Sequence, residues 1–244
     1  GSLRRPAGPA TARSIAVLPF ANLSPNPENE YFSDGITEDL IAQISKIRDL
    51  KVISRTSTMR YKGTDKALGA IGEELGVTHI LEGSVRRGGN RVRIVAQLID
   101  AESDEHLWAE TYDRELTDVF AIQSEVAIQV AVALQTALSA AELARGRNAP
   151  TKSMEAYALY LVGRHQASLR SDDGLRRAVE YFERALEKDP RYAAACAGLA
   201  DAHLLSGIGY RSIPPGDALD KAKVFALKAL TLDDTLPEAH AALG

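Results

Sequence analysis

Apolar residues recur with two different spacings along this chain, and the change of spacing divides it. Up to about residue 144, short apolar runs alternate with stretches in which apolar residues fall three or four positions apart, as in strands followed by helices. Beyond about residue 153 only the helical spacing continues. The sequence therefore predicts an α/β domain at 14–144 and an all-α domain at 153–244, joined by a linker at 145–152.

The first half of the α/β domain alternates strand and helix. SIAVLPF at 14–20 is a short apolar run interrupted by a proline, which predicts a strand buried on both faces. Helical spacing follows from about Ser33 to Ile47. LKVISR at 50–55 then predicts a second strand, and DKALGAIGEELGV at 65–77 predicts a second helix. Such alternation implies right-handed crossovers and a parallel core.

The second half of the domain predicts three consecutive strands and one long helix. The strands are THILEGSVRR at 78–87, NRVRIVAQLID at 90–100 and EHLWAETYD at 105–113. The sequence RGGN between the first two suits a hairpin turn, since Gly and Asn accept positive φ angles. Every second residue from Val92 to Leu98 is apolar, so we expect one buried face, and a helix follows at 117–143. The expected order is β-α-β-α-β-β-β-α with a mixed sheet.

The helical domain contains a repeat. AVEYFERALEKDPRYAAACAGLA at 178–200 aligns with AKVFALKALTLDDTLPEAHAALG at 222–244, which pairs Ala178 with Ala222 and Ala185 with Ala229. Small residues at helix contacts and a period near ~34 residues are typical of tetratricopeptide repeats. We expect about two repeats and the start of a third, with IGYRSIPPG inserted in the second. A solenoid that stops at Gly244 would expose an apolar face, so we expect further repeats to follow.

The first domain also resembles a known family. The segments SIAVLPFANLSPNPENEYFSDGITEDLIAQIS, LKVISRTSTMRYKG and LGVTHILEGSVRRGGNRVRIVAQLIDAESDEHLWAETYDREL are similar to the TolB amino-terminal-like domain, and the match extends from Ser14 to about Leu138. Followed by tetratricopeptide repeats, this domain resembles the carboxy-terminal half of bacterial adenylate/guanylate cyclases, serine/threonine kinases or winged-helix regulators. The resemblance implies a half that is not catalytic, with the output domain upstream.

Composition excludes several classes of protein. The chain has 244 residues, 45% of them hydrophobic and 25% charged, as in soluble globular proteins of two domains. A net charge of −4 argues against nucleic acid as a partner, and one cysteine, Cys196, excludes an internal disulfide. We expect Cys196 in the core. Residues 1–13 predict a tag and linker, and a membrane helix could precede them.

The stretch YFSDGITEDL at 31–40 concentrates polar residues around a glycine. Asp34, Glu38 and Asp39 could form a metal or catalytic cluster. The same residue types also begin helices, and we expect Ser33 or Asp34 to be the N-cap. No histidine or cysteine lies nearby and no calcium-loop spacing is present, so we predict no metal and no cofactor.

Two groups of residues are candidate binding sites. The predicted hairpin holds Arg86, Arg87, Arg91 and Arg93, which either form a solvated tip or contact an anion or an acidic partner.

The other group lies on the face that a repeat solenoid uses for ligands. The first helices of the repeats would present Tyr157, Tyr160, Arg164 and Asp201 there. One interpretation is that these side chains bind a peptide. The other is that the tyrosines pack against the last helix of the first domain.

The sequence therefore favours a non-enzymatic regulatory or scaffolding region of a bacterial signalling protein, one class being the class III cyclases. Its partner would be a protein or peptide, its own upstream domain included, or a second copy of the chain; no nucleic acid is expected. The cytoplasm is favoured, or the periplasm if a membrane helix precedes the chain. The alternative is a nucleotide- or small-molecule-binding α/β enzyme that uses the crevice at the strand ends, lined by Asp34 and residues 54–59.

Overall fold

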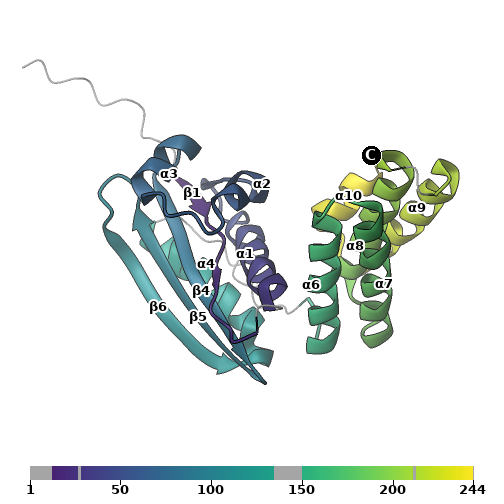
Figure 1. Cartoon of the computed structure of the whole chain (residues 1–244), viewed down its shortest axis with the longest axis horizontal. Coiled ribbons are helices and arrows are strands. Elements are labelled where there is room, and N and C mark those ends of the chain that lie inside the picture. Colours follow the sequence, from purple (N-terminus) through teal and green to yellow (C-terminus); the bar gives the residue numbers. More distant parts are fainter. Residues whose placement is uncertain (1–12, 27–28, 135–149, 211–212, 244) are drawn as a thin grey trace, which may run out of the picture. The chain divides into compact units, whose positions relative to one another are not determined.

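A computed structural model of the chain describes residues 13–26, 29–134, 150–210 and 213–243. Contacts divide the chain into two units (Figure 1). The first unit holds the sheet and the helices packed on it. The second holds the helices after residue 149, and the segment Glu30–Gly35 is grouped with it. Most of the predicted linkers at 1–13 and 145–152 lies outside the described residues.

The first unit is built on a six-stranded mixed sheet. The strands are β1 (Ser14–Val17), β2 (Ala21–Asn22), β3 (Lys51–Val52), β4 (His79–Gly88), β5 (Arg91–Asp100) and β6 (His106–Glu115). Their order is β3-β1-β4-β5-β6, with β2 beside β4. Strand β1 runs parallel to β3 and β4, whereas β4, β5 and β6 form an antiparallel meander. The predicted mixed sheet is confirmed; the sequence reading missed β2 and overestimated the length of β3.

Helices pack on both faces of this sheet. They are α1 (Glu30–Ile44), α2 (Arg55–Thr58), α3 (Leu68–Leu75) and α4 (Val119–Ala133), with short 3₁₀ turns at Met59–Tyr61 and Leu116–Asp118. Helix α4 packs against β5 and β6. It also reaches α1, because the side chain of Gln123 donates to the Asp39 carboxylate at 3.0 Å. The predicted extension of α4 to residue 143 lies outside the described residues.

The period of the strands decides which side chains are buried. Val92, Ile94, Ala96 and Leu98 of β5 are at most 1% exposed, which confirms the predicted alternation. On the other face, α3 covers β1 and β4 through a cluster that includes Ile71. Toward β6 that face carries exposed and half-buried polar side chains.

Helix α4 is the one described helix long and apolar enough to cross a membrane by length and composition, counted with the turn before it over Leu116–Ala133. Half of that span is buried in the unit, and Val119, Ile122, Val126 and Val130 are fully buried. We therefore interpret α4 as a core helix of the α/β unit.

The predicted N-cap at Ser33 or Asp34 is wrong. Helix α1 begins at Glu30 after Asn29, and no side chain caps it. Ser33 and Asp34 lie in its first turns and are 0% and 7% exposed. The physical reason is Phe32, also buried, which extends the apolar spacing of the helix one turn before Ile36.

The second unit is a set of helices in two layers. They are α6 (Met154–Ser168), α7 (Asp172–Lys188), α8 (Ala193–Leu204), α9 (Pro215–Leu232) and α10 (Pro237–Leu243), with a π-helical turn at Leu205–Gly209. Each helix packs on the next, and α8 also packs on α6 and α10, so α6, α8 and α10 form one layer and α7 and α9 the other. Ser153 and Ser171 cap α6 and α7 by accepting from the amides of Ala156 and Gly174.

Small residues let these helices approach closely. The aligned pairs Ala178 and Ala222, and Ala185 and Ala229, are at most 1% exposed on α7 and α9. Cys196 is fully buried among alanines, as expected. Phe182 of α7 lies against two glycines, because a Cβ added to Gly163 of α6 or Gly198 of α8 would come within 2.7 Å of its ring. One aromatic ring thus sets the spacing of three helices.

We predict that Gly198→Ala destabilises the second unit. Alanine favours a helix interior, yet the added methyl group would overlap the buried Phe182 ring, and such overpacking costs about 1–3 kcal/mol. Gly216→Ala in α9 is the matched control, since nothing lies within 4 Å of the added Cβ. Urea unfolding followed by circular dichroism should show a loss for Gly198→Ala and none for Gly216→Ala. Equal midpoints would contradict the close approach.

We also predict that the second unit weakens in mild acid. His203 is buried and stacks on Phe225, with ring centroids 5.8 Å apart, and burial lowers the pKa of its imidazole, as does Lys221. The unfolded chain therefore binds a proton more readily, so the stability is full above about pH 6.5 and falls as the pH drops below that value.

His203→Phe keeps the stacked ring and removes the titration. The stability difference between pH 7.5 and 5.5, measured by urea unfolding, should shrink in this variant and stay as in the wild type in His106→Phe, where the histidine is exposed. An unchanged difference in His203→Phe would assign the acid sensitivity to other groups.

Candidate functional site

The layer of α6, α8 and α10 presents an aromatic and charged surface in the second unit. Tyr160 of α6 packs on Tyr192 and Phe182, with ring centroids 5.0 and 5.8 Å apart. The guanidinium carbon of Arg164, one turn further along α6, lies 5.3 Å from the centroid of the Tyr160 ring. This is cation–π geometry, which holds the guanidinium in a fixed place.

Each helix of this layer adds a charge to the surface. Burial lowers the pKa of the Arg164 guanidinium to about 10, while Tyr192 and Glu238 of α10 favour its charged form. Burial raises the pKa of the Asp201 carboxyl on α8, and Glu238 raises it further, whereas Arg170 opposes the shift. Glu238 of α10 therefore acts on both Arg164 of α6 and Asp201 of α8. A surface of this kind offers an aromatic anchor, one cation and two carboxylates.

Three of the four residues predicted for this surface have side chains at least partly accessible. Tyr160 and Arg164 are half-buried and Asp201 is exposed. Tyr157 is 1% exposed and does not offer a contact surface as it stands. Tyr160 packs on Phe182 and Tyr192, which both belong to the second unit. The alternative interpretation instead expected the tyrosines to pack against the last helix of the first domain.

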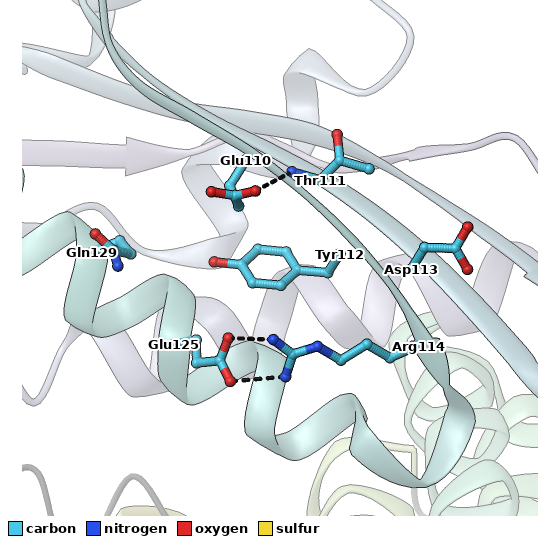
Figure 2. A pocket seen from close by; sticks show the side chains of 7 residues that line it. All are labelled: Glu110, Thr111, Tyr112, Asp113, Arg114, Glu125 and Gln129. Atoms are coloured by element: carbon cyan, nitrogen blue, oxygen red, sulfur yellow. Dashed lines mark hydrogen bonds and ion pairs between the residues drawn. The ribbon is translucent and has the colours of Figure 1, made fainter.

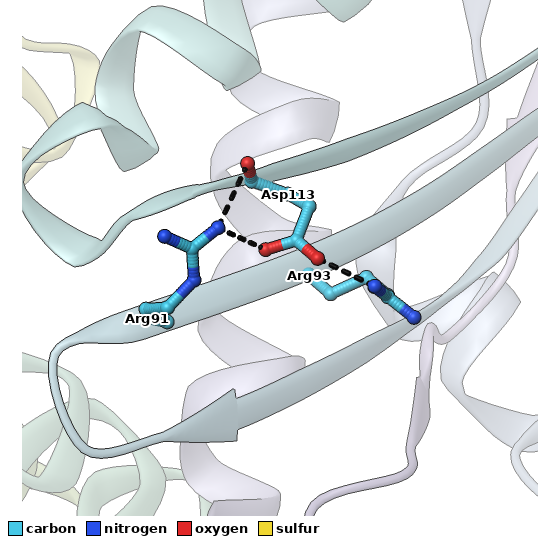
Figure 3. A network of polar contacts seen from close by, with 3 residues as sticks. All are labelled: Arg91, Arg93 and Asp113. Carbon is cyan, nitrogen blue, oxygen red and sulfur yellow. Dashed lines mark hydrogen bonds and ion pairs between the residues drawn. The ribbon is translucent and has the colours of Figure 1, made fainter.

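The four hairpin arginines do not form one patch. Side chains alternate along β4, so Arg86 and Arg87 point to opposite faces of the sheet, and Arg86 lies across from Arg93. Arg91 and Arg93 both bind the Asp113 carboxylate of β6, with shortest distances of 2.6 and 2.5 Å (Figure 3). These two arginines lower the pKa of the Asp113 carboxyl. The predicted anion site is thus partly neutralised by an internal carboxylate.

A pocket that the sequence reading missed lies between β6 and α4. Its lining includes Tyr112 and Arg114 of β6 and Glu125 and Gln129 of α4, and its volume is about 450 Å³ (Figure 2). Arg114 donates two hydrogen bonds of 2.8 Å to Glu125. Burial raises the pKa of the Tyr112 hydroxyl to about 12, with Glu125 and Glu110 adding to the shift.

Two residue patterns in the sequence contribute to this pocket. Glu110, Tyr112 and Arg114 alternate along one strand, and Glu125 and Gln129 are four residues apart on one helix. Each pattern alone is ordinary. Only the packing of α4 on β6 brings them together.

The polar residues near the strand ends are engaged within the first unit. Thr37 accepts a hydrogen bond from the Phe20 amide at 2.9 Å, and Glu38 pairs with Arg55 at 3.1 Å. Residues 54–59 form α2 and the start of a 3₁₀ turn, and Thr58 is buried there. Within the described part of the chain, no three His, Cys, Asp or Glu side chains come together as metal ligands would.

Comparison with known proteins gives one family match and one close relative. Residues 11–129 match the family described as "HilA/YgeH-like transcriptional regulator, second domain". The chain is 44% identical over 228 residues to a protein of Rhizobium meliloti (strain 1021) named "Putative adenylate cyclase 3". This match covers 93% of the chain and 39% of that relative, so the chain spans well under half of the relative's length.

Solved structures are similar to part of the chain at low identity. Lipoprotein GNA1162 from Neisseria meningitidis is 20% identical with a TM-score of 0.38, covering 48% of this chain and 96% of that one. TolB from Acinetobacter baumannii is 14% identical with a TM-score of 0.39, covering 52% of this chain and 29% of that one.

The Asp113 carboxylate leads to a prediction about charge. Asp113→Asn should release Arg91 and Arg93 and raise the salt concentration at which the chain elutes from a heparin column. Glu102→Gln changes the net charge equally at an exposed position in the turn before β6, so it is the control. Only Asp113→Asn should elute later than expected from charge alone. Coincident elution of the two variants would show that the two arginines already bind anions freely.

Proposed function

We propose that this chain is a non-catalytic regulatory region of a bacterial signalling protein, and that its helical unit binds a protein segment. The observation that carries the proposal is the surface of α6, α8 and α10, where Arg164 stacks on Tyr160 and Glu238 acts on both Arg164 and Asp201. Aromatic and arginine side chains dominate binding energy at protein interfaces, and here both are held in place by packing.

The relatives support the regulatory part of the proposal. One bears the name of an adenylate cyclase and the matching family that of a transcriptional regulator, so related regions are found with different output activities. We expect a region shared between such proteins to sense a ligand or to transmit a signal rather than to catalyse a reaction. The chain corresponds to 39% of the cyclase-named relative, which leaves room there for a separate catalytic domain.

The two-layer packing supports a tetratricopeptide arrangement for the second unit. Helices alternate between layers, buried alanines recur at aligned positions of α7 and α9, and glycines allow close contact with Phe182. In such arrays the layer of first helices forms the ligand-binding face. In this chain that layer is α6, α8 and α10, which carries the candidate surface.

Selection of peptides from a random display library, panned on the purified chain, tests this proposal. Enriched peptides should bind the wild type and lose about tenfold in affinity to Tyr160→Ala and Arg164→Gln, a loss expected for an interface hot spot. Arg177→Gln is the control, because Arg177 lies on α7 in the other layer and pairs with Asp173. Circular dichroism should confirm that all variants fold.

The same preparations should form no cyclic nucleotide from ATP or GTP with Mg²⁺ or Mn²⁺. The proposal is wrong if no peptide is enriched, or if the enriched peptides bind the α6 variants and the α7 control alike. Cyclic nucleotide formation that is lost on substituting a residue of this chain would contradict its non-catalytic part.

A further inference from the structure

The pocket between β6 and α4 forms a groove along the outer edge of β6. The pocket between β6 and α4 is lined by the five consecutive residues 110–114, together with Glu125 and Gln129. Neighbouring side chains on a strand point to opposite faces, so a space that all five residues line lies along the strand's edge. Strand β6 is the last in the order of the sheet, and no described strand pairs with that edge.

One backbone amide at this edge has a weak hydrogen bond. The Thr111 amide donates to the carboxylate of its own neighbour, Glu110, at 3.4 Å, the long end of hydrogen-bond distances (Figure 2). A backbone carbonyl from an added strand would be a better acceptor for that amide. If such a strand paired with β6, the Glu110 carboxylate would also be free to bind another group.

The hydroxyl of Tyr112 points into the same groove. Tyr112 is 6% exposed, and its hydroxyl makes no hydrogen bond within the described part of the chain. In Figure 2 the hydroxyl lies among the side chains of Glu110, Glu125 and Gln129. A ligand that bonds to this hydroxyl would replace water in the groove, and a group that can accept or donate at that point fits it best.

The charges of the groove favour a cation. Arg114 and Glu125 neutralise each other through two hydrogen bonds, whereas Glu110 forms no ion pair with any residue that the structure describes. The pKa of about 12 keeps the Tyr112 hydroxyl protonated and neutral at physiological pH. Asp113 also lines the groove, from the other face of β6, and is paired there with Arg91 and Arg93. On the face of β6 that α4 covers, Glu110, Arg114 and Glu125 carry one excess negative charge. The flanking residues Glu115 and Asp118 are also acidic.

We propose that this groove binds an extended segment of a partner protein, which pairs with β6 and places a lysine side chain beside Tyr112 and Glu110. Strand addition supplies backbone hydrogen bonds, and a side-chain pocket beside the edge supplies specificity. The free edge, the loosely bonded Thr111 amide and the acidic pocket meet in one place, so a basic extended segment fits all three. This site lies in the α/β unit and is independent of the surface on the helical unit.

The test uses three short peptides, blocked at both ends and made of alternating threonine and valine around a central lysine, norleucine or glutamate. Trp108 is the chain's single tryptophan and lies on β6 on the same face as Glu110 and Tyr112, so its fluorescence reports binding. The lysine peptide should change this fluorescence and shift the backbone amide resonances of β6. It should bind about tenfold more tightly than the norleucine peptide, as expected for one charge-assisted hydrogen bond.

Two variants and a control locate the site. Glu110→Gln and Tyr112→Phe should each lose most of the preference for lysine over norleucine, whereas Glu105→Gln, at an exposed position before β6, should keep it. Amide resonances of the other strands should remain in place, which shows that the variants fold.

Butylamine, the lysine side chain without a backbone, separates the two parts of the proposal. It should bind far more weakly than the lysine peptide, because it cannot pair with β6. Equal affinity for both would overturn strand addition. Absence of binding at millimolar peptide, equal binding of the norleucine peptide, or an unchanged preference in Glu110→Gln would overturn the whole proposal.

Discussion

The contact of the Phe182 ring with two glycines is the constraint on which the second unit depends. A side chain at Gly163 or Gly198 would meet this ring, so only glycine lets α6 and α8 come so near to α7. This close spacing puts Tyr160 within reach of Phe182 and Tyr192, and the tyrosine in turn supports the Arg164 guanidinium. The proposed binding surface is therefore a consequence of helix packing rather than of any one exposed side chain.

In the first unit, strand β6 has a different character on its two faces. On one face, Asp113 forms ion pairs with two arginines of β5, and these pairs connect β6 to β5. On the other, Tyr112 lies beside Glu110 and the Arg114–Glu125 pair. Because alternate residues of one strand serve these two roles, the strand can be held in the sheet by one face while its edge and the other face remain available to a ligand.

Features with a strong local period could be predicted from the sequence. The buried face of β5 and the alanine contacts of α7 and α9 follow from spacings of two and of three to four residues. Helix α1 begins earlier than predicted because the buried Phe32 extends its apolar series one turn before Ile36. The arginines were expected in one cluster, although the alternation along β4 separates Arg86 from Arg87. The groove at β6 could not be found, since it depends on which strand α4 covers.

The central claim is that the Phe182 ring and the glycines act as one packing unit beneath the surface of α6, α8 and α10. A double-mutant cycle of Phe182→Leu and Gly198→Ala, measured by urea unfolding, tests it most directly. With the ring removed, the added methyl group should cost less, and the account predicts a coupling of about 1 kcal/mol or more between the two sites. Costs that add to within about 0.3–0.5 kcal/mol would contradict the account, because independent sites behave in that way.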